Sequence, residues 1–381
     1  MKFVGILYLI ILLALIVGGV VANGVDSELN AVELADASVS ERAQELHGSL
    51  FIADLHSDLL LWDRDPRRRN AIGQSDLQRL SEGGVELQVF STVSATPRGQ
   101  NFDANTLEGG DNITLLAAAQ GWPVATWGSI FERAIHQSRK LIALERARHL
   151  TVVRVAADMD EPGLKGILLS EGAHPLEGDV ANVGRLFAAG YRVMGLQHFF
   201  DNELGGSMHG GTGKGLTSFG REAVAELNRA GFILDLAHSS EAVVDEVLAL
   251  AREKRLSRPL MVSHTGLRAA CASTFNRNIR DDQLKTIADG GGLVGIGFFG
   301  GAICDTSPAG IARTIRIAVD TLGEDAVALG SDFDGAVVTQ ITAAELPQLT
   351  QALLDEGLTE PTIRKVMGGN ADRFFRAHLP Q

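Results

Sequence analysis

Eight short apolar runs, separated by amphipathic helical patterns, constrain the fold of this chain more than any other feature of its sequence. Apolar runs of this length that alternate with helices are typical of a parallel sheet covered by helices. Eight such strands are the number that closes a (β/α)8 barrel of the TIM type. An open doubly wound sheet is the alternative, but no Gly-x-Gly-x-x-Gly motif follows an early run. The runs occupy residues 50–58, 85–93, 165–173, 193–199, 232–240, 259–266, 293–300 and 326–335.

Residues 49–381 are therefore predicted to form one α/β barrel domain. The long interval at 94–164 has a helical pattern, and we expect it to be an insertion after the second strand. The pattern at 216–231 begins behind Thr217 and ends at Gly231, residue types that suit the two caps of a helix.

The N-terminus contains an uncharged apolar stretch from residue 3 to residue 22. Twenty residues at about 1.5 Å each are long enough to cross a hydrocarbon core of roughly 30 Å. Residues 1–22 are therefore predicted to be a signal anchor, and the alternative is a signal peptide cleaved near "VVA" at 20–22. Residues 23–48 are acidic and polar, and we expect a tether that runs into a first helix. Either alternative places the domain outside the cytoplasm: periplasmic or on the cell surface if anchored, secreted if cleaved.

The formal net charge of −13 argues against a nucleic-acid partner, because phosphate binding needs clustered cations. The one dense basic run, at 64–70, is expected to be a solvated loop. Two cysteines, Cys271 and Cys304, exclude a cysteine-based zinc site. Their pairing cannot be derived from the sequence.

Polar residues gather at the carboxyl ends of the predicted strands. In a barrel these ends form one face, which is where an active site is built. Residues far apart in the sequence would therefore converge on a single cavity. They are His56, Asp58, Glu171, His198, His238, His264 and Asp332.

Five of these residues suit two metal ions better than one. Histidine and carboxylate ligands fit a borderline divalent cation such as zinc, and a single catalytic zinc uses only three protein ligands. Two ions that share one bridging carboxylate would use all five: His56, Asp58, Glu171, His238 and His264. A water between two cations loses a proton readily, which supplies a hydroxide nucleophile.

Several longer motifs also resemble one family. In order they are "ADLHSD", "LSEGAHPL", "YRVMGLQHFFDN", "GLTSFGREAVAELNRAGFILDLAHSS", "PLMVSHTG", "RNIRDDQL", "GSDFDG" and "GGNADRFF", which together span residues 50–377. The chain resembles the membrane (renal) dipeptidases, metallopeptidases among the amidohydrolase-like barrels. The resemblance implies a metallodipeptidase whose hydroxide, bridging two zinc ions, attacks the peptide carbonyl, and a C-terminal D-residue would be tolerated.

The resemblance also implies a role for each site residue. One zinc ion would be bound by His56 and Asp58, the other by His238 and His264, and Glu171 would bridge the two as a catalytic ligand. His198 would face the scissile carbonyl, and Arg277, in "RNIRDD", would bind the terminal carboxylate of the substrate. Asp332 would contact the substrate and transfer the proton.

Three alternatives for individual residues stay open. Asp334 rivals Asp332 as the acid/base, because strand alternation lets both face inward. His174 could replace Glu171 as a ligand. His209 lies in a glycine-rich loop over the barrel mouth, where we expect a solvated position and where substrate contact is the alternative.

Two other functions compete with a dipeptidase. Another binuclear amidohydrolase could act on acyl-amino acids, lactams or lactones, and a barrel that has lost its chemistry could only bind. The family is often dimeric, so a homodimer is expected.

Overall fold

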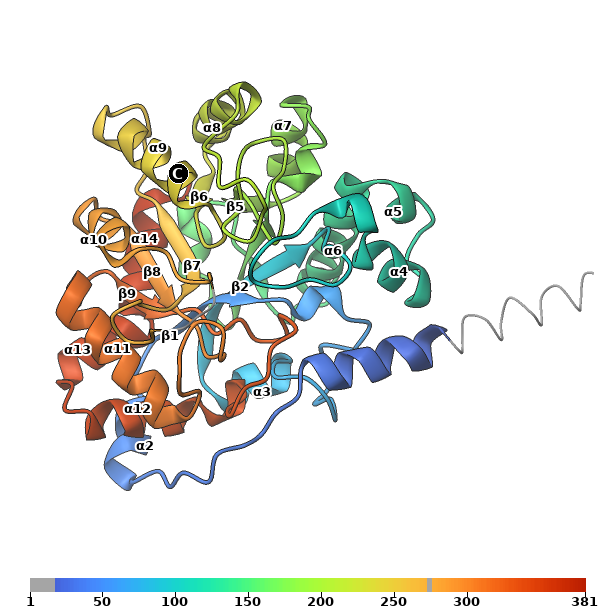
Figure 1. Cartoon of the computed structure of the whole chain (residues 1–381). Helices are drawn as coiled ribbons and strands as arrows, with labels where there is room; N and C mark the ends of the chain where they lie inside the picture. The colour runs from blue at the N-terminus through green and yellow to red at the C-terminus, as the bar shows by residue number, and fades with distance from the viewer. Residues whose placement is uncertain (1–17, 273–275) are drawn as a thin grey trace, which may run out of the picture.

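The computed structural model describes residues 18–272 and 276–381, and its centre is a closed ring of parallel strands (Figure 1). The ring runs β2-β1-β9-β8-β7-β6-β5-β4, and pairing between β2 and β4 closes it. The predicted eight-stranded barrel is thus confirmed. Its strands are β1 (Ile52–Ser57), β2 (Val85–Val93), β4 (Lys165–Glu171), β5 (Tyr191–Gly195), β6 (Ile233–Asp235), β7 (Met261–Thr265), β8 (Leu293–Ile296) and β9 (Val327–Leu329).

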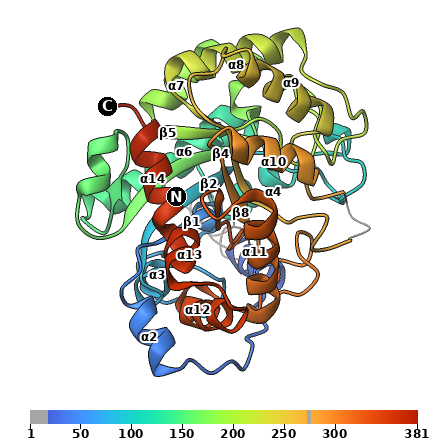
Figure 2. The same ribbon diagram turned by 90° about the vertical axis from the view of Figure 1, so that its left-hand side faces the viewer.

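Helices surround this ring on its outer side (Figures 1 and 2). The short strand β3 (Thr151–Val152) pairs with the start of β4 outside the ring. The helices are α2 (Glu41–His47), α3 (Leu77–Glu82), α4 (Asn112–Ala119), α5 (Ala125–Gly128), α6 (Ile130–Arg146), α7 (Ala181–Ala188), α8 (Ser218–Ala230), α9 (Glu241–Arg252), α10 (Asp281–Asp289), α11 (Pro308–Leu322), α12 (Leu346–Asp355), α13 (Glu360–Arg364) and α14 (Asn370–His378).

The predicted insertion and helix caps are present. Helices α4, α5 and α6 follow β2 before the chain enters β4. The side chain of Thr217 accepts a hydrogen bond from the backbone N–H of Gly220 at the start of α8. Gly231 ends that helix at φ 100°, in the left-handed region that glycine adopts without steric cost.

Two apolar layers hold the barrel together. The outer layer lies between the strands and the helices and contains most of the buried aliphatic side chains. The inner layer fills the barrel, where inward-facing residues such as Leu55, Val89 and Ile167 pack together. Phe375 of α14 joins this inner layer, so the last helix covers the interior at the end of the barrel where the strands begin.

The N-terminal helix (residues 18–29) is attached to the barrel by a buried ion-pair network. Nε of Arg64 lies 2.8 Å from Oδ2 of Asp26 on the helix, and its Nη2 lies 2.8 Å from Oδ1 of Asp334 after β9. Arg64 is only 7% exposed, so the prediction of a solvated loop for the whole basic run was wrong at this residue. Two opposing carboxylates make its burial favourable.

The segment after the N-terminal helix also lies against the barrel. Val32 forms a parallel bridge with Thr339, and the backbone N–H of Ala35 donates to the carbonyl of Gln340. Most of the predicted signal anchor, residues 1–17, lies outside the described residues. Within the part of the chain that the structure describes, no helix is both long enough and apolar enough to cross a bilayer.

Cys271 and Cys304 form a disulfide, which settles the pairing that the sequence left open. It joins the segment after β7 to the segment after β8, and Arg277 lies on the first of these.

Candidate metal centre

All seven polar residues predicted at strand ends converge on one end of the barrel. Each lies in the last residues of its strand or within three positions after it, and each is at most 6% exposed. They come from six strands of the ring. His56 and Asp58 belong to β1, Glu171 to β4, His198 to β5, His238 to β6, His264 to β7 and Asp332 to β9.

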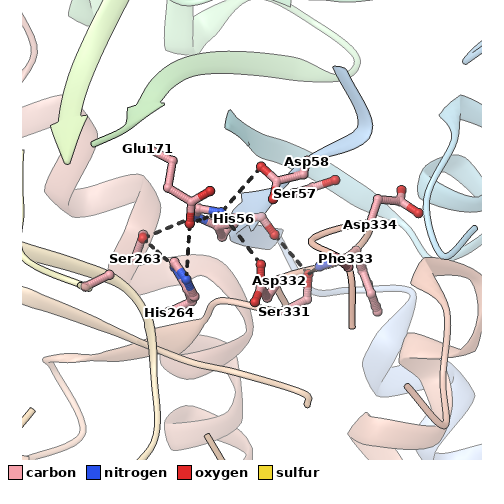
Figure 3. A network of polar contacts seen from close by, with 12 residues as sticks. His56, Ser57, Asp58, Glu171, Ser263, His264, Ser331, Asp332, Phe333 and Asp334 are labelled. Carbon is pink, nitrogen blue, oxygen red and sulfur yellow. Dashed lines mark hydrogen bonds and ion pairs between the residues drawn. The ribbon is translucent and has the colours of Figure 1, made fainter. Parts of the chain in front are cut away.

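Glu171 lies at the middle of this cluster (Figure 3). Its Oε1 is 3.4 Å from Nε2 of His56, 3.1 Å from Nε2 of His238 and 3.5 Å from Nε2 of His264. Nε2 of His56 is also 3.6 Å from Oδ1 of Asp58. Two sets of three ligand atoms therefore share one glutamate: His56 and Asp58 with Glu171, and His238 and His264 with Glu171.

The donor atoms of this cluster fit divalent cations. Nε2 of His56, Oδ1 of Asp58 and Oε2 of Glu171 are buried and have no hydrogen-bond partner among the described residues. Burial and the neighbouring Asp58 raise the pKa of Glu171 well above its usual value. Burial alone would lower the pKa of His56, but Glu171 and Asp58 raise it to about 10. Cations would compensate the buried negative charge and use the unpaired atoms.

Ser263 fixes the tautomers of two histidines. Its Oγ donates to Oδ2 of Asp235 at 2.6 Å, and it lies 3.2 Å from Nδ1 of His56 and 2.8 Å from Nδ1 of His264. Because its only proton goes to Asp235, Ser263 can only accept from the two rings. With a cation bound at each Nε2, both imidazoles would carry their remaining hydrogen on Nδ1 and donate it to Ser263. The sequence analysis missed Ser263 and Asp235, since neither lies in a metal-binding pattern.

Asp332 reaches the cluster through an unusual backbone conformation. Its φ is +64°, which is rare outside glycine, and its Oδ1 lies 3.7 Å from Nε2 of His56. Gly335 makes room for it, because a Cβ at that position would lie 2.1 Å from Oδ1 of Asp332. Strained backbone of this kind concentrates at functional sites. Burial raises the pKa of Asp332 to about 7, against the opposing effect of His56.

Asp334 points away from the cluster (Figure 3). Its carboxylate accepts hydrogen bonds from the backbone of Gln74 and from the backbone and hydroxyl of Ser75, and it pairs with Arg64. These contacts occupy both oxygens. Of the two aspartates, Asp332 is therefore the one that can act in the cluster.

Two further histidines are buried beside the cluster. His174 stacks on Phe200 with ring centroids 4.3 Å apart, and it belongs to none of the three-residue groups of ligand atoms. His209 stacks on Phe199 at 4.5 Å and is fully buried, so the prediction of a solvated position was wrong. Aromatic neighbours in the loop after β5 bury it.

Arg277 and His198 lie beside the cluster. The guanidinium of Arg277 is 1% exposed and donates to the carbonyls of Ala237 and His264. No carboxylate of the described residues pairs with it directly, although Asp332 and Glu171 act on it from a distance. Nε2 of His198 lies 3.4 Å from Oε2 of Glu171, and burial lowers the pKa of its ring well below the usual value.

A cavity of about 760 Å³ opens over these residues. Asp58, Glu171, His198, Arg277 and Asp332 all line it. A buried arginine without a direct acidic partner, facing such a cavity, is suited to bind an anionic ligand.

The whole barrel matches one family model. Residues 40–379 match the model for "Membrane dipeptidase (Peptidase family M19)". A curated relative from Klebsiella pneumoniae, an uncharacterized protein in the pqqA 5' region, is 32% identical over 222 residues, which are 54% of this chain and 79% of the relative.

Several solved structures are similar to this chain in their overall fold. A metallo peptidase from Rhodobacter sphaeroides, liganded with a phosphinate mimic of the dipeptide L-Ala-D-Ala, is 26% identical over 87% of this chain and 99% of its own, with a TM-score of 0.69. Dipeptidase AC, a metallo peptidase of family M19, is 26% identical over 87% of this chain and 100% of its own, with a TM-score of 0.68. The probable dipeptidase PvdM from Pseudomonas aeruginosa, 18% identical over 88% of this chain and 97% of its own, shares the fold with a TM-score of 0.70.

Proposed function

The chain belongs to the membrane dipeptidase family of metallopeptidases, and on that premise we propose that it hydrolyses dipeptides with two zinc ions. His56 and Asp58 would hold one ion. His238 and His264 would hold the other, and Glu171 would bridge the two. The observation that carries the proposal is that Glu171 belongs to two of the three groups of buried ligand atoms, one with His56 and Asp58 and the other with His238 and His264. Two ions sharing a carboxylate are a recurrent arrangement in hydrolytic enzymes.

When bound, the metal pair would supply an activated water and polarise the scissile carbonyl. The protein itself would position the substrate. The planar guanidinium of Arg277 matches a carboxylate and would bind the C-terminal carboxylate of the dipeptide. Because that carboxylate must enter the cavity, a peptide extended at its C-terminus would not fit. The ring of His198, kept neutral by burial, would donate a hydrogen bond to the carbonyl oxygen of the substrate.

Asp332 would transfer the proton. The oxygen of the attacking water adds to the carbonyl carbon, and its proton passes to the carboxylate of Asp332. As the C–N bond breaks, Asp332 returns that proton to the leaving amine. General acid–base catalysis of this kind contributes roughly 10²–10⁴-fold.

We further propose that a D-residue is tolerated on the carboxyl side of the scissile bond. The mimic bound to the Rhodobacter sphaeroides enzyme is of L-Ala-D-Ala, which supports this part of the proposal.

The protein is further proposed to work outside the cytoplasm, anchored through residues 1–22 and assembled as a homodimer. The apolar stretch at 3–22 supports the anchor, although its last residues, 18–22, lie against the barrel, where Gly18 approaches Ala119 of α4. The disulfide between Cys271 and Cys304 supports an oxidising compartment, because such bonds rarely persist in the cytosol.

Metal content and turnover, measured on the purified full chain, test the proposed function. We expect about two zinc ions per chain, hydrolysis of L-Ala-L-Ala and L-Ala-D-Ala, loss of both activities on chelation, and recovery with zinc. Two ions without dipeptide turnover would contradict the proposal and favour an amidohydrolase of acyl-amino acids, lactams or lactones. Absence of bound metal and of turnover would favour a binding protein.

A further inference from the structure

One side of the cavity is an apolar wall that none of the roles above uses. It consists of Val21, Val25 and Leu29 from the N-terminal helix and of Ile113 and Leu116 from α4, and all five line the cavity that Asp58, Glu171 and Asp332 also line. Val25 is 40% exposed and Leu29 is 41% exposed. A ligand that covered these side chains would bury apolar surface, which is favourable.

The wall is a built part of the molecule, because the described part of the N-terminal helix is held at two points. Gly18 lies so close to α4 that a Cβ there would be 2.9 Å from the carbonyl oxygen of Ala119. Figure 1 shows the helix next to α4. Towards its end, Asp26 pairs with the buried Arg64 and accepts a hydrogen bond from the amide of Asn30. Oδ1 of Asn30 in turn accepts from the backbone of Ala336, next to the loop that carries Asp332.

Three polar side chains near the wall are already bonded to their surroundings. The amide of Asn112 donates to the carbonyl of Pro97, and that of Asn101 donates to the carbonyls of Gly99 and Ala104. The indole N–H of Trp62 donates to the carbonyl of Asp334. A ligand at the wall would therefore meet mainly aliphatic and aromatic surface, which selects an apolar group.

The wall and Arg277 lie on opposite sides of the barrel mouth. Helix α4 belongs to the connection after β2, and Arg277 follows β7. In the closed ring β2 and β7 are four strands apart in either direction, so they face each other across the barrel. The metal cluster lies between them. A dipeptide with its carboxylate on Arg277 and its scissile carbonyl at the cluster would therefore extend its amino-side residue towards the wall.

We propose that this apolar wall is a subsite for the side chain of the amino-side residue, and that it selects dipeptides whose first residue is large and apolar. This inference rests on the proposed function, which places the carboxylate on Arg277. It makes the N-terminal helix a determinant of specificity, because Val25 and Leu29 contribute directly to the surface that the substrate would contact.

Two dipeptides with the same composition test the direction of this preference. We expect kcat/KM for Leu-Gly to exceed that for Gly-Leu by roughly tenfold or more, since an apolar pocket discriminates by at least that factor for groups of this size. A preference for Gly-Leu, or equal values, would overturn the proposal.

A pair of double variants tests the wall itself. The double variant Val25→Thr/Leu29→Gln keeps the size and charge of the side chains but makes the wall polar. We expect the ratio of kcat/KM for Leu-Gly to kcat/KM for Gly-Leu to fall by roughly tenfold. The matched control is Val20→Thr/Leu34→Gln, on residues that are 68% and 59% exposed and do not line the cavity. The control variant should have the same ratio of kcat/KM for the two dipeptides as the wild type.

The outcomes separate this proposal from the proposed function. If both dipeptides are hydrolysed and the ratio is the same in all three proteins, the subsite is wrong while the dipeptidase stands. If a zinc-loaded chain hydrolyses neither dipeptide, the proposed function is wrong, and the subsite fails with it.

Discussion

At the scale of single residues, a serine determines whether two histidines can act as ligands. Ser263 has one proton, and the short contact to Asp235 assigns it. In the proposed metal-bound state, the rings of His56 and His264 would then donate from Nδ1 and present Nε2 to the metal. The metal centre therefore depends on a residue that would not bind metal itself.

We expect Ser263→Ala to weaken zinc binding by roughly 10–100-fold, the usual effect of removing a group that orients a ligand. Titration with a competing chelator measures this directly. Ser91→Ala is the matched control: Ser91 is equally buried, and its hydroxyl has no hydrogen-bond partner among the described residues. Equal zinc affinity in the Ser263 and Ser91 variants would show that the hydroxyl does not set the tautomers.

At the scale of elements, the N-terminal helix depends on one buried arginine. Removing the cation of Arg64 would leave Asp26 and Asp334 as buried, unpaired carboxylates. We expect Arg64→Met to lower the free energy of unfolding by about 3–5 kcal/mol. Urea unfolding measures the loss. Arg67→Met, which removes an exposed pair with Asp65, should leave the free energy of unfolding close to that of the wild type. Similar stability of both variants would contradict this account of the attachment.

The sequence predicted the elements of the barrel far better than the contacts between distant segments. Strands buried on both faces are continuous apolar runs, and the caps of α8 follow from Thr217 and Gly231. The carboxyl ends of these strands also predicted which side chains would converge. Arg64 and Ser263 were missed for a common reason. Each acts through partners elsewhere in the chain, and no local pattern records those partners.

At the scale of the whole molecule, burial of neutral histidines makes the fold sensitive to acid. Burial lowers the pKa of His136 to about 4, and the nearby Lys140 and Arg139 add to the effect. Burial also lowers the pKa of His174 to about 3 and that of His209 to about 3. An unfolded histidine has a pKa near 6.5. The contribution of these neutral rings to folding stability is therefore fully present above pH 6.5. It is lost progressively as the pH falls from 6.5 towards the pKa values of the folded state, about 4 for His136 and about 3 for His174 and His209.

The variant His136→Phe tests the direction of this pH dependence, because phenylalanine can keep the packing against Trp122 but cannot bind a proton. Between pH 7 and pH 5 we expect the variant to lose about 1 kcal/mol less stability than the wild type, after allowance for screening of the half-buried ring. Urea unfolding of the zinc-loaded proteins at both pH values measures the difference. A variant with the same loss as the wild type would contradict it.

The closure of the ring has a consequence for biosynthesis. Strand β9 completes the barrel by pairing with β1, so Asp332 joins His56 only after almost the whole chain has been made. A ribosome that has produced the first seven strands of the ring carries an incomplete set of site residues. With the proton transfer proposed for Asp332, such a nascent chain would still lack its acid/base, and hydrolysis would begin only when the last strand docks.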